Sequence, residues 1–261
     1  MMNERRISIA VLLVFLIISP GCTVKEDREL CPCWLLEDLS ECYGSDSPLY
    51  ISAWKNGRLF LEAINVRYFP AGFETTVARN VVEVSAYQGL KEMFQDGHRL
   101  LIPSGNEADS IYAHCSTVNA TGENAYDLIS LHKQFATVTV VISDCPDYVS
   151  HELVLKGNVC GMDILDFSPI EGSFHCRARE MGKGVWSFRL PRQKDASLTL
   201  ELIEDGEFLK EYRVGEAILS GGYSWNKEDL DDIHLELEYN KSSVSVTVKD
   251  WEEEKDRQYN Y

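Results

Sequence analysis

The chain has 261 residues, of which 44% are hydrophobic and 10% aromatic, and its formal net charge is −17. This composition supports a packed core and excludes a wholly disordered chain. The negative charge argues against nucleic acid as a partner, because phosphate groups would be repelled. The length suffices for two ordinary domains or one large one.

The first 21 residues predict a signal peptide. Arg5 and Arg6 give a positive start, and residues 7–18, ISIAVLLVFLII, form an apolar core of twelve residues. The run is too short to cross a bilayer, which needs roughly 20 apolar residues. Its length fits the apolar region of a signal peptide. We therefore expect residues 1–21 to be removed during export.

Cys22 stands where the apolar segment ends. Residues 19–22, Ser-Pro-Gly-Cys, resemble a bacterial lipobox, although Ser19 occupies a position that is usually leucine. The alternative is an ordinary cleavage site, with Cys22 in the folded framework. We favour lipidation of Cys22, because small residues precede it at the end of the run. Several acyl chains anchor a protein stably, whereas one binds only marginally. Residues 22–33 would then be a lipidated tether.

The remaining chain carries mostly β-strand signals. Asn56-Gly57 separates two apolar runs, which predicts a hairpin with a type I′ turn over residues 51–64. Alternating or β-branched runs predict further strands at residues 81–87, 110–115, 136–143, 198–202, 208–214, 233–239 and 244–248. Two stretches, residues 87–95 and 125–134, suggest short helices.

Many short strands separated by turn signals predict an all-β fold of antiparallel β-sandwiches. The polar stretch 119–123, followed by a possible short helix, is the best candidate for a connector between domains. We therefore expect an N-terminal β-sandwich at residues 34–130 and a C-terminal one at residues 131–261.

No metal-binding or catalytic pattern is present. Seven cysteines besides Cys22 leave at least one unpaired, and their spacings do not form paired zinc knuckles: Cys31, Cys33, Cys42, Cys115, Cys145, Cys160 and Cys176. His151-Glu152 lacks the second histidine of a zinc protease. The acidic run 228–232 lacks the calcium-loop pattern and is expected to be a solvated turn. We predict no catalytic residue, metal or cofactor, although a glycosidase with a carboxylate pair needs no local motif.

Several motifs together resemble one family. They are residues 24–28, 31–35, 102–105, 108–112, 221–225, 229–233 and 249–252, with sequences VKEDR, CPCWL, IPSG, ADSIY, GGYSW, DLDDI and KDWE. In order and spacing they resemble the fimbrillin-associated anchoring lipoproteins, the minor base subunits of type V fimbriae in anaerobic Gram-negative bacteria. The resemblance covers nearly the whole mature chain.

This resemblance implies two tandem transthyretin-like sandwiches, no enzyme activity, and a surface-exposed location at the outer membrane through the lipid on Cys22. It implies fimbrillin shaft subunits as partners, joined by strand exchange. Lys25, Glu26 and Asp27 resemble the surface-export signal of such lipoproteins; the alternative is a charged tether.

The terminal alternating strand, with Val244, Val246 and Val248, is the candidate for this exchange, because a sheet edge can pair with another chain. The alternative is an ordinary last core strand. Two other functions stay open. One is a fimbrial tip or shaft subunit. The other is a glycan-binding surface lipoprotein, for which Trp54, Trp186 and Trp225 are the candidate aromatics if they are exposed.

Overall fold

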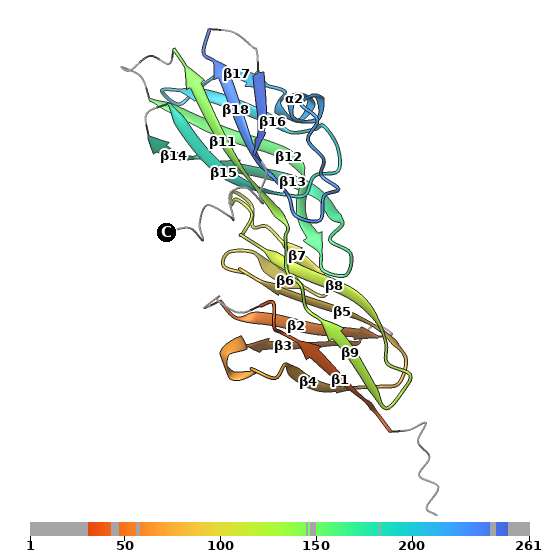
Figure 1. Ribbon diagram of the computed structural model, residues 1–261. Coiled ribbons are helices and arrows are strands. Elements are labelled where there is room, and N and C mark those ends of the chain that lie inside the picture. The colour runs from red at the N-terminus through yellow and green to blue at the C-terminus, as the bar shows by residue number, and fades with distance from the viewer. Residues whose placement is uncertain are drawn as a thin grey trace, which may run out of the picture.

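The structure is a computed structural model that describes residues 31–42, 47–55, 58–144, 146, 150–182, 184–240 and 244–249. The signal peptide, Cys22 and the export residues Lys25, Glu26 and Asp27 lie outside the described residues. Two β-sandwiches are stacked end to end, which makes the molecule elongated (Figure 1).

The first sandwich contains a three-stranded and a five-stranded sheet. The small sheet has the order β4 (Phe73–Val77), β1 (Cys33–Asp38) and β9 (Asn124–Leu128). The large sheet has the order β10 (His132–Lys133), β8 (Tyr112–Asn119), β5 (Val81–Gln88), β2 (Leu49–Lys55) and β3 (Arg58–Ile64). A short 3-10 helix, η1 (Val66–Tyr68), follows β3. Inward-facing apolar side chains such as Leu35, Ile51 and Val84 pack between the sheets.

The second sandwich is larger. One sheet has the order β14 (Arg179–Gly182), β15 (Val185–Pro191), β11 (Phe135–Ser143), β18 (Asp232–Glu238) and β19 (Val244–Lys249). The other has the order β17 (Glu207–Tyr212), β16 (Thr199–Glu204), β12 (His151–Asp163), β7 (Arg99–Leu101) and β6 (Phe94–Asp96), and β13 (Pro169–Arg177) pairs with β12. Among the described residues, α2 (Val214–Ser220) is the one α-helix.

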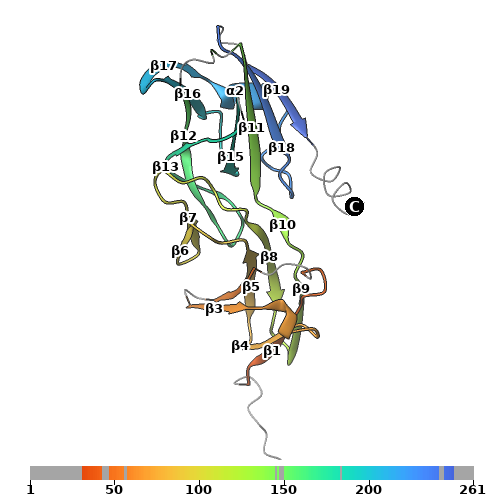
Figure 2. The ribbon, with the colours of Figure 1, turned by 90° about the vertical axis from the view of Figure 1, so that its left-hand side faces the viewer.

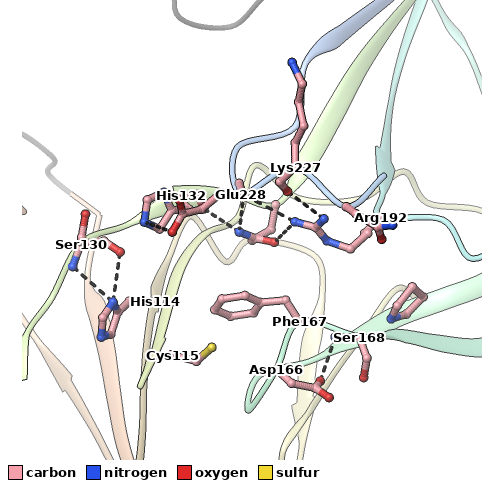
Figure 3. Close-up of a pocket in the computed structure, with 13 residues that line it drawn as sticks. His114, Cys115, Ser130, His132, Asp166, Phe167, Ser168, Arg192, Lys227 and Glu228 are labelled. Atoms are coloured by element: carbon pink, nitrogen blue, oxygen red, sulfur yellow. Dashed lines mark hydrogen bonds and ion pairs between the residues drawn. The ribbon is translucent and has the colours of Figure 1, made fainter. Parts of the chain in front are cut away.

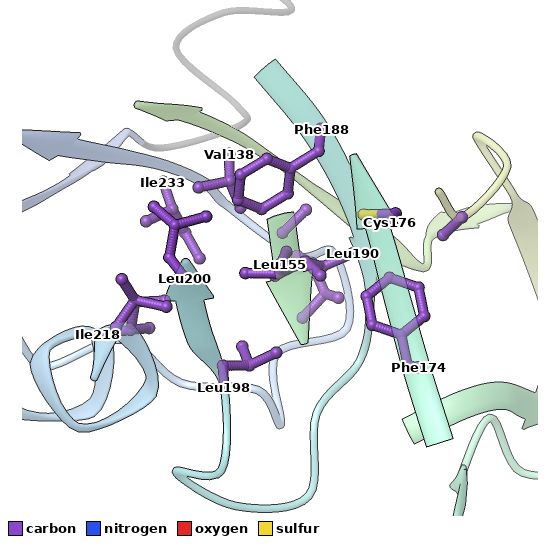
Figure 4. Close-up of a cluster of buried hydrophobic side chains, with 14 of the residues drawn as sticks. Val138, Leu155, Phe174, Cys176, Phe188, Leu190, Leu198, Leu200, Ile218 and Ile233 are labelled. Atoms are coloured by element: carbon purple, nitrogen blue, oxygen red, sulfur yellow. The ribbon is translucent and has the colours of Figure 1, made fainter. Parts of the chain in front are cut away.

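Alternation along the strands builds the core of this sandwich. In β11, Val138, Val140 and Ile142 are buried, whereas the residues between them, Thr139 and Val141, are half-buried on the outer face. Because successive side chains of a strand point to opposite faces, this spacing places one apolar row on the facing sheet. Figure 4 shows Val138 beside Phe188 and Ile233, with Ile218 of α2 closing one side of the cluster.

The hairpin β6–β7 belongs to the first half of the chain but completes a sheet of the second sandwich. Leu100 and Leu101 of β7 pair with Met162 and Gly161 of β12. The approach is close: a Cβ on Gly161 would lie 2.2 Å from the carbonyl oxygen of Leu100. Leu100 also joins the hydrophobic core of the second sandwich. The two halves are therefore connected by a shared sheet as well as by the chain itself.

The expected all-β sandwich fold is confirmed, with corrections in detail. Two strand pairs are parallel, β1 with β9 and β11 with β18. Parallel pairing is possible here because the strands of each pair are far apart in the chain, so a long crossover connection joins them and not a hairpin. The expected helices are wrong: residues 87–95 contain the end of β5 and the start of β6, and residues 125–134 contain most of β9 and all of β10. The polar stretch 119–123 is the turn between β8 and β9, so it is not a connector between sandwiches.

Candidate functional site: the terminal edge strand and the cleft between the sandwiches

The predicted exchange strand forms one edge of a sheet. β19 pairs antiparallel with β18, and within the described residues no strand pairs with its outer side. The register joins Val244 to Leu237, Val246 to Leu235 and Val248 to Ile233. An edge of this kind presents main-chain N–H and C=O groups that can pair with another chain.

The three valines face the core and are partly buried, whereas Ser245 and Thr247 are exposed on the opposite face. Val246 lies against the end of α2, since a Cβ on Gly221 would be 3.2 Å from its side chain. The structure therefore brings the valines together as the last core strand of the sandwich. It leaves the outer main-chain edge of that strand uncovered by any other described strand.

The side of the sandwich next to β19 is closed by α2, which contacts both β19 and β16 (Figure 2). The opposite sheet ends at β17, where Phe208 and Leu209 are 62% and 42% exposed. Exposed apolar side chains on an edge strand are a feature of protein contact surfaces. The sequence pattern predicts a strand here but does not reveal that its apolar side chains are exposed.

A cleft of about 660 Å³ opens between the two sandwiches (Figure 3). His114 and Cys115 of β8 line one wall, and Phe167 and Arg192 come from the second sandwich. The Arg192 guanidinium donates hydrogen bonds to Gln134 Oε1 at 2.8 Å and to the Lys227 carbonyl at 2.9 Å. Burial lowers the pKa of Arg192 from its usual value. These contacts fix the guanidinium at the back of the cleft.

The acidic run 228–232 is not the solvated turn expected from the sequence. Lys133, which is fully buried, places its Nζ 2.7 Å from Asp232. Asp229 accepts a hydrogen bond from the Lys133 amide at 2.6 Å, and Asp231 pairs with Lys227 at 2.6 Å. The run therefore fastens the segment that leads from the first sandwich into β11. Sequence patterning cannot reveal the buried ion pair, because Lys133 is far from the run in the chain.

A second polar cluster lies inside the first sandwich. Asp127 accepts a hydrogen bond from Ser116 Oγ at 2.7 Å, and His114 Nε2 lies 3.4 Å from it. Glu37 is beside Asp127 in the register, is fully buried, and accepts no hydrogen bond from the described residues. Burial, followed by the charge of Asp127, raises the pKa of Glu37 to about 8. Serine donates here to a carboxylate and not to the histidine, so this cluster is no Ser–His nucleophile.

None of the tryptophans proposed for glycan stacking is fully exposed. Trp186 and Trp225 are 3% and 6% exposed, and half-buried Trp54 meets His98 edge-on with ring centroids 5.7 Å apart. Trp34 and Tyr126 are instead 57% and 70% exposed on the small sheet of the first sandwich. The exposure of Trp34 could have been predicted from the sequence, because Trp34 stands between the apolar residues Cys33 and Leu35. Both of these are buried on the opposite face of the strand.

The described residues contain no group of three metal-ligating side chains placed to hold an ion. Over the same residues, no helix combines the length and apolar character that crossing a bilayer requires.

Solved structures with the same architecture are known, although no family model and no curated protein matches the sequence. The fimbrial anchor protein Mfa2 from Porphyromonas gingivalis matches 85% of this chain and 98% of its own, with a TM-score of 0.55 and 13% identity. The chain has the fold of a fimbrial anchor protein. The resemblance stated from the sequence is thus confirmed at the level of the fold.

Two further structures align over the same 85% of this chain, both with TM-scores of 0.55. One is a candidate polysaccharide-binding protein from Bacteroides thetaiotaomicron, 12% identical and covered over 96% of its length. The other is a candidate adhesin from Bacteroides ovatus, 8% identical and covered over 94%. At these identities the likeness extends to the fold and to nothing finer.

Proposed function

We propose that this protein is a non-enzymatic surface lipoprotein that fixes a fimbrium to the outer membrane. The observation that carries the proposal is the fold shared with a fimbrial anchor protein along nearly the whole length of both chains. The signal-peptide pattern ending at Cys22 supports attachment to the membrane, which we call the membrane end of the protein. The open edge of β19 supports attachment to the fimbrium, which we call the polymer end.

The membrane end is the lipid on Cys22. Each buried CH₂ group contributes about 0.8 kcal/mol, so several acyl chains on one residue hold a protein firmly. Lys25, Glu26 and Asp27 follow the lipid and direct the protein to the cell surface. The tether that ends at Cys33 then leads directly into β1, the central strand of the small sheet.

The polymer end is β19, which exchanges or shares strand pairing with a fimbrillin shaft subunit. Main-chain hydrogen bonds along a strand supply affinity, and alternate side chains that fill pockets supply register. Val244, Val246 and Val248 supply this alternation on one face of β19. Phe208 and Leu209 of β17, the edge strand of the other sheet, are exposed and offer a second apolar contact surface.

Force applied at β19 has to reach the tether through both sandwiches. The pairing of β7 with β12 and the ion pair of Lys133 with Asp232 connect the two halves at separate points. A load is thereby shared between a sheet and a buried ionic contact. This arrangement suits a mechanical joint better than a flexible linker does.

The test of the polymer end compares two lysine substitutions on neighbouring residues. Val246→Lys places a charge on the face that packs against the core, and we expect fimbriae to detach or fail to join. Thr247→Lys places the same charge on the exposed face and should leave assembly normal. Circular dichroism of both proteins identifies loss of folding. Normal fimbriae on cells that carry a folded Val246→Lys protein would contradict the role of β19.

A fimbrial tip or shaft subunit is the alternative role. Such a subunit loses its lipidated N-terminus by proteolysis, whereas an anchor has to keep it. The mass of the mature N-terminal peptide distinguishes the two. An anchor yields a lipidated peptide that begins at Cys22.

A further inference from the structure

The small sheet of the first sandwich has an apolar outer face. Trp34 on β1, and Tyr126 and Leu128 on β9, are 57%, 70% and 48% exposed. The half-buried Leu36 joins them, because it lies two residues from Trp34 on β1 and opposite Tyr126 in the register. Figure 1 shows β1 and β9 side by side in the first sandwich. We call these four side chains the aromatic face.

The core of the sandwich does not require these side chains. The inner positions of the same two strands already carry buried apolar residues such as Leu35 and Ala125. The outer positions of a half-buried sheet are usually polar, as Glu74 and Thr76 are on the neighbouring strand β4. Contiguous exposed apolar side chains mark surfaces that contact another protein or a membrane. The aromatic face is therefore a candidate contact surface.

The charge of the small sheet restricts what can cover this face. The strands β1, β4 and β9 contain no lysine or arginine. The charged groups on the outer face are the carboxylates of Glu74 and of the half-buried Asp38. An anionic surface or a polyanion would be repelled by them. A layer of neutral lipid headgroups would not, and tryptophan and tyrosine are enriched at this level because it accepts both the apolar ring and its polar tip.

The position of the face in the chain favours the membrane as its partner. This step rests on the proposed lipidation of Cys22. The chain advances eleven residues from 22 to 33, and such a segment spans at most about 40 Å even when fully extended. Trp34 follows directly, so it stays within roughly the thickness of one bilayer from the lipid, about 40–45 Å. A short tether keeps a second contact at a high effective concentration, so even a weak affinity for the membrane surface suffices.

We propose that the aromatic face lies on the membrane surface, with the rings of Trp34 and Tyr126 at the level of the lipid headgroups. The lipid on Cys22 then holds the protein, and the aromatic face orients the first sandwich on the bilayer. Because β19 belongs to the second sandwich, this contact does not occupy the strand proposed for the polymer end.

The test uses the chain from Thr23 onwards, with an N-terminal histidine tag that a nickel-chelating lipid holds on phosphatidylcholine vesicles. The tag replaces the native lipid, so the result does not depend on modification of Cys22. Acyl chains brominated near the headgroup quench tryptophan fluorescence on contact, whereas iodide quenches tryptophans that are open to water. Subtracting the spectrum of Trp34→Phe isolates the signal of Trp34. The same protein without vesicles is the reference.

We expect the brominated lipid to quench Trp34, and iodide to quench it severalfold less on vesicles than in solution. Two reporters in the Trp34→Phe protein provide matched comparisons. Leu128→Trp, on the same face, should also be quenched by the lipid. Phe208→Trp, on the exposed part of β17, should stay open to iodide and be unaffected by the lipid. Raising the salt concentration should change none of these results, because no basic side chain takes part.

Three results would overturn the proposal. The first is no lipid quenching of Trp34 or of Leu128→Trp, and the second is equal lipid quenching of Phe208→Trp. The third is a Trp34 that is shielded from iodide without vesicles, since the tether or a second copy of the chain would then cover the face. An unmodified Cys22 in the native protein, detected by mass spectrometry of the mature N-terminal peptide, would instead contradict the proposed anchoring, and the tagged protein would still report on the face.

Discussion

Glu37 offers a direct test of how a buried charge limits the stability of the first sandwich. Its side chain lies on the inner face of β1 with Leu35, and it neighbours Asp127 across the sheet. Neither carboxyl oxygen accepts a hydrogen bond from the described residues. Desolvation, and then the charge of Asp127, raise the pKa of Glu37 from 4.5 to about 8. We predict that Glu37→Gln stabilises the protein in alkaline solution.

The sign follows from proton linkage. The folded protein holds the Glu37 proton more tightly than the unfolded chain, so stability is greatest below the unfolded pKa. It then falls as the pH rises through the folded pKa of about 8. One pKa unit corresponds to 1.36 kcal/mol, which gives a loss of roughly 3–5 kcal/mol between about pH 4.5 and about pH 8. Total stabilities of single domains are about 5–15 kcal/mol, so the effect is large.

The assay is denaturant unfolding of the wild type and of Glu37→Gln at about pH 5 and about pH 9. Glutamine resembles the protonated carboxyl, so the two proteins should be similar in acid. In alkali the variant should be more stable by a few kcal/mol. Glu74→Gln, an exposed change on the neighbouring strand β4, is the control and should follow the wild type. A constant difference between wild type and Glu37→Gln at both pH values would refute the reasoning.

Three further predictions concern the junction of the two halves. Gly161→Ala should cost about 2 kcal/mol or more of unfolding free energy, because its methyl would meet the Leu100 carbonyl oxygen; unchanged denaturant unfolding would contradict the shared sheet. Lys133→Met should cost about 3 kcal/mol, since Asp232 loses a buried partner, and calorimetry should show that adding Asp232→Asn recovers part of it. Phe167→Gly should be about 1 kcal/mol more stable than Phe167→Ala, because glycine adopts a positive φ without strain; equal melting temperatures would count against that strain.

Much of the fold could be predicted from local pattern. The alternation in β11, β18 and β19 is strict, and each of these strands buries the apolar row that its sequence presents. The hairpin of β2 and β3 follows from two apolar runs around a turn signal, and those strands do pair. Such predictions succeed because period-2 burial is a property of a single strand and needs no knowledge of its partner.

Pairing over long distances could not be predicted in this way. Nothing in residues 94–101 indicates that they complete a sheet with β12, about 60 residues further along the chain. The first helix prediction failed because apolar residues within 87–95 make long-range contacts and do not form a helix face: Tyr87 stacks on Tyr50, and Met93 joins the core of the second sandwich. The acidic run 228–232 was misread because Lys133, its buried partner, is equally remote.

The candidate sites likewise differ in whether local sequence pattern is enough to identify them. Val244, Val246 and Val248 could be singled out from alternation, and the structure adds that they form a sheet edge. The cleft between the sandwiches could not be identified from the sequence, because its lining comes from several distant segments. The positive φ of Phe167 also has no signal in the sequence. The lipidation of Cys22 and the export role of Lys25, Glu26 and Asp27 stay predictions, since these residues lie outside those described.

The central claim is that this protein joins a fimbrium to the membrane through Cys22, and the distribution of fimbriae in a Cys22→Ala strain tests it most directly. Immunoblots and electron microscopy would measure fimbriae on washed cells and in the culture medium. The account predicts a folded protein and assembled fimbriae that appear mainly in the medium. Fimbriae that remain on the cells in normal number and length would contradict it.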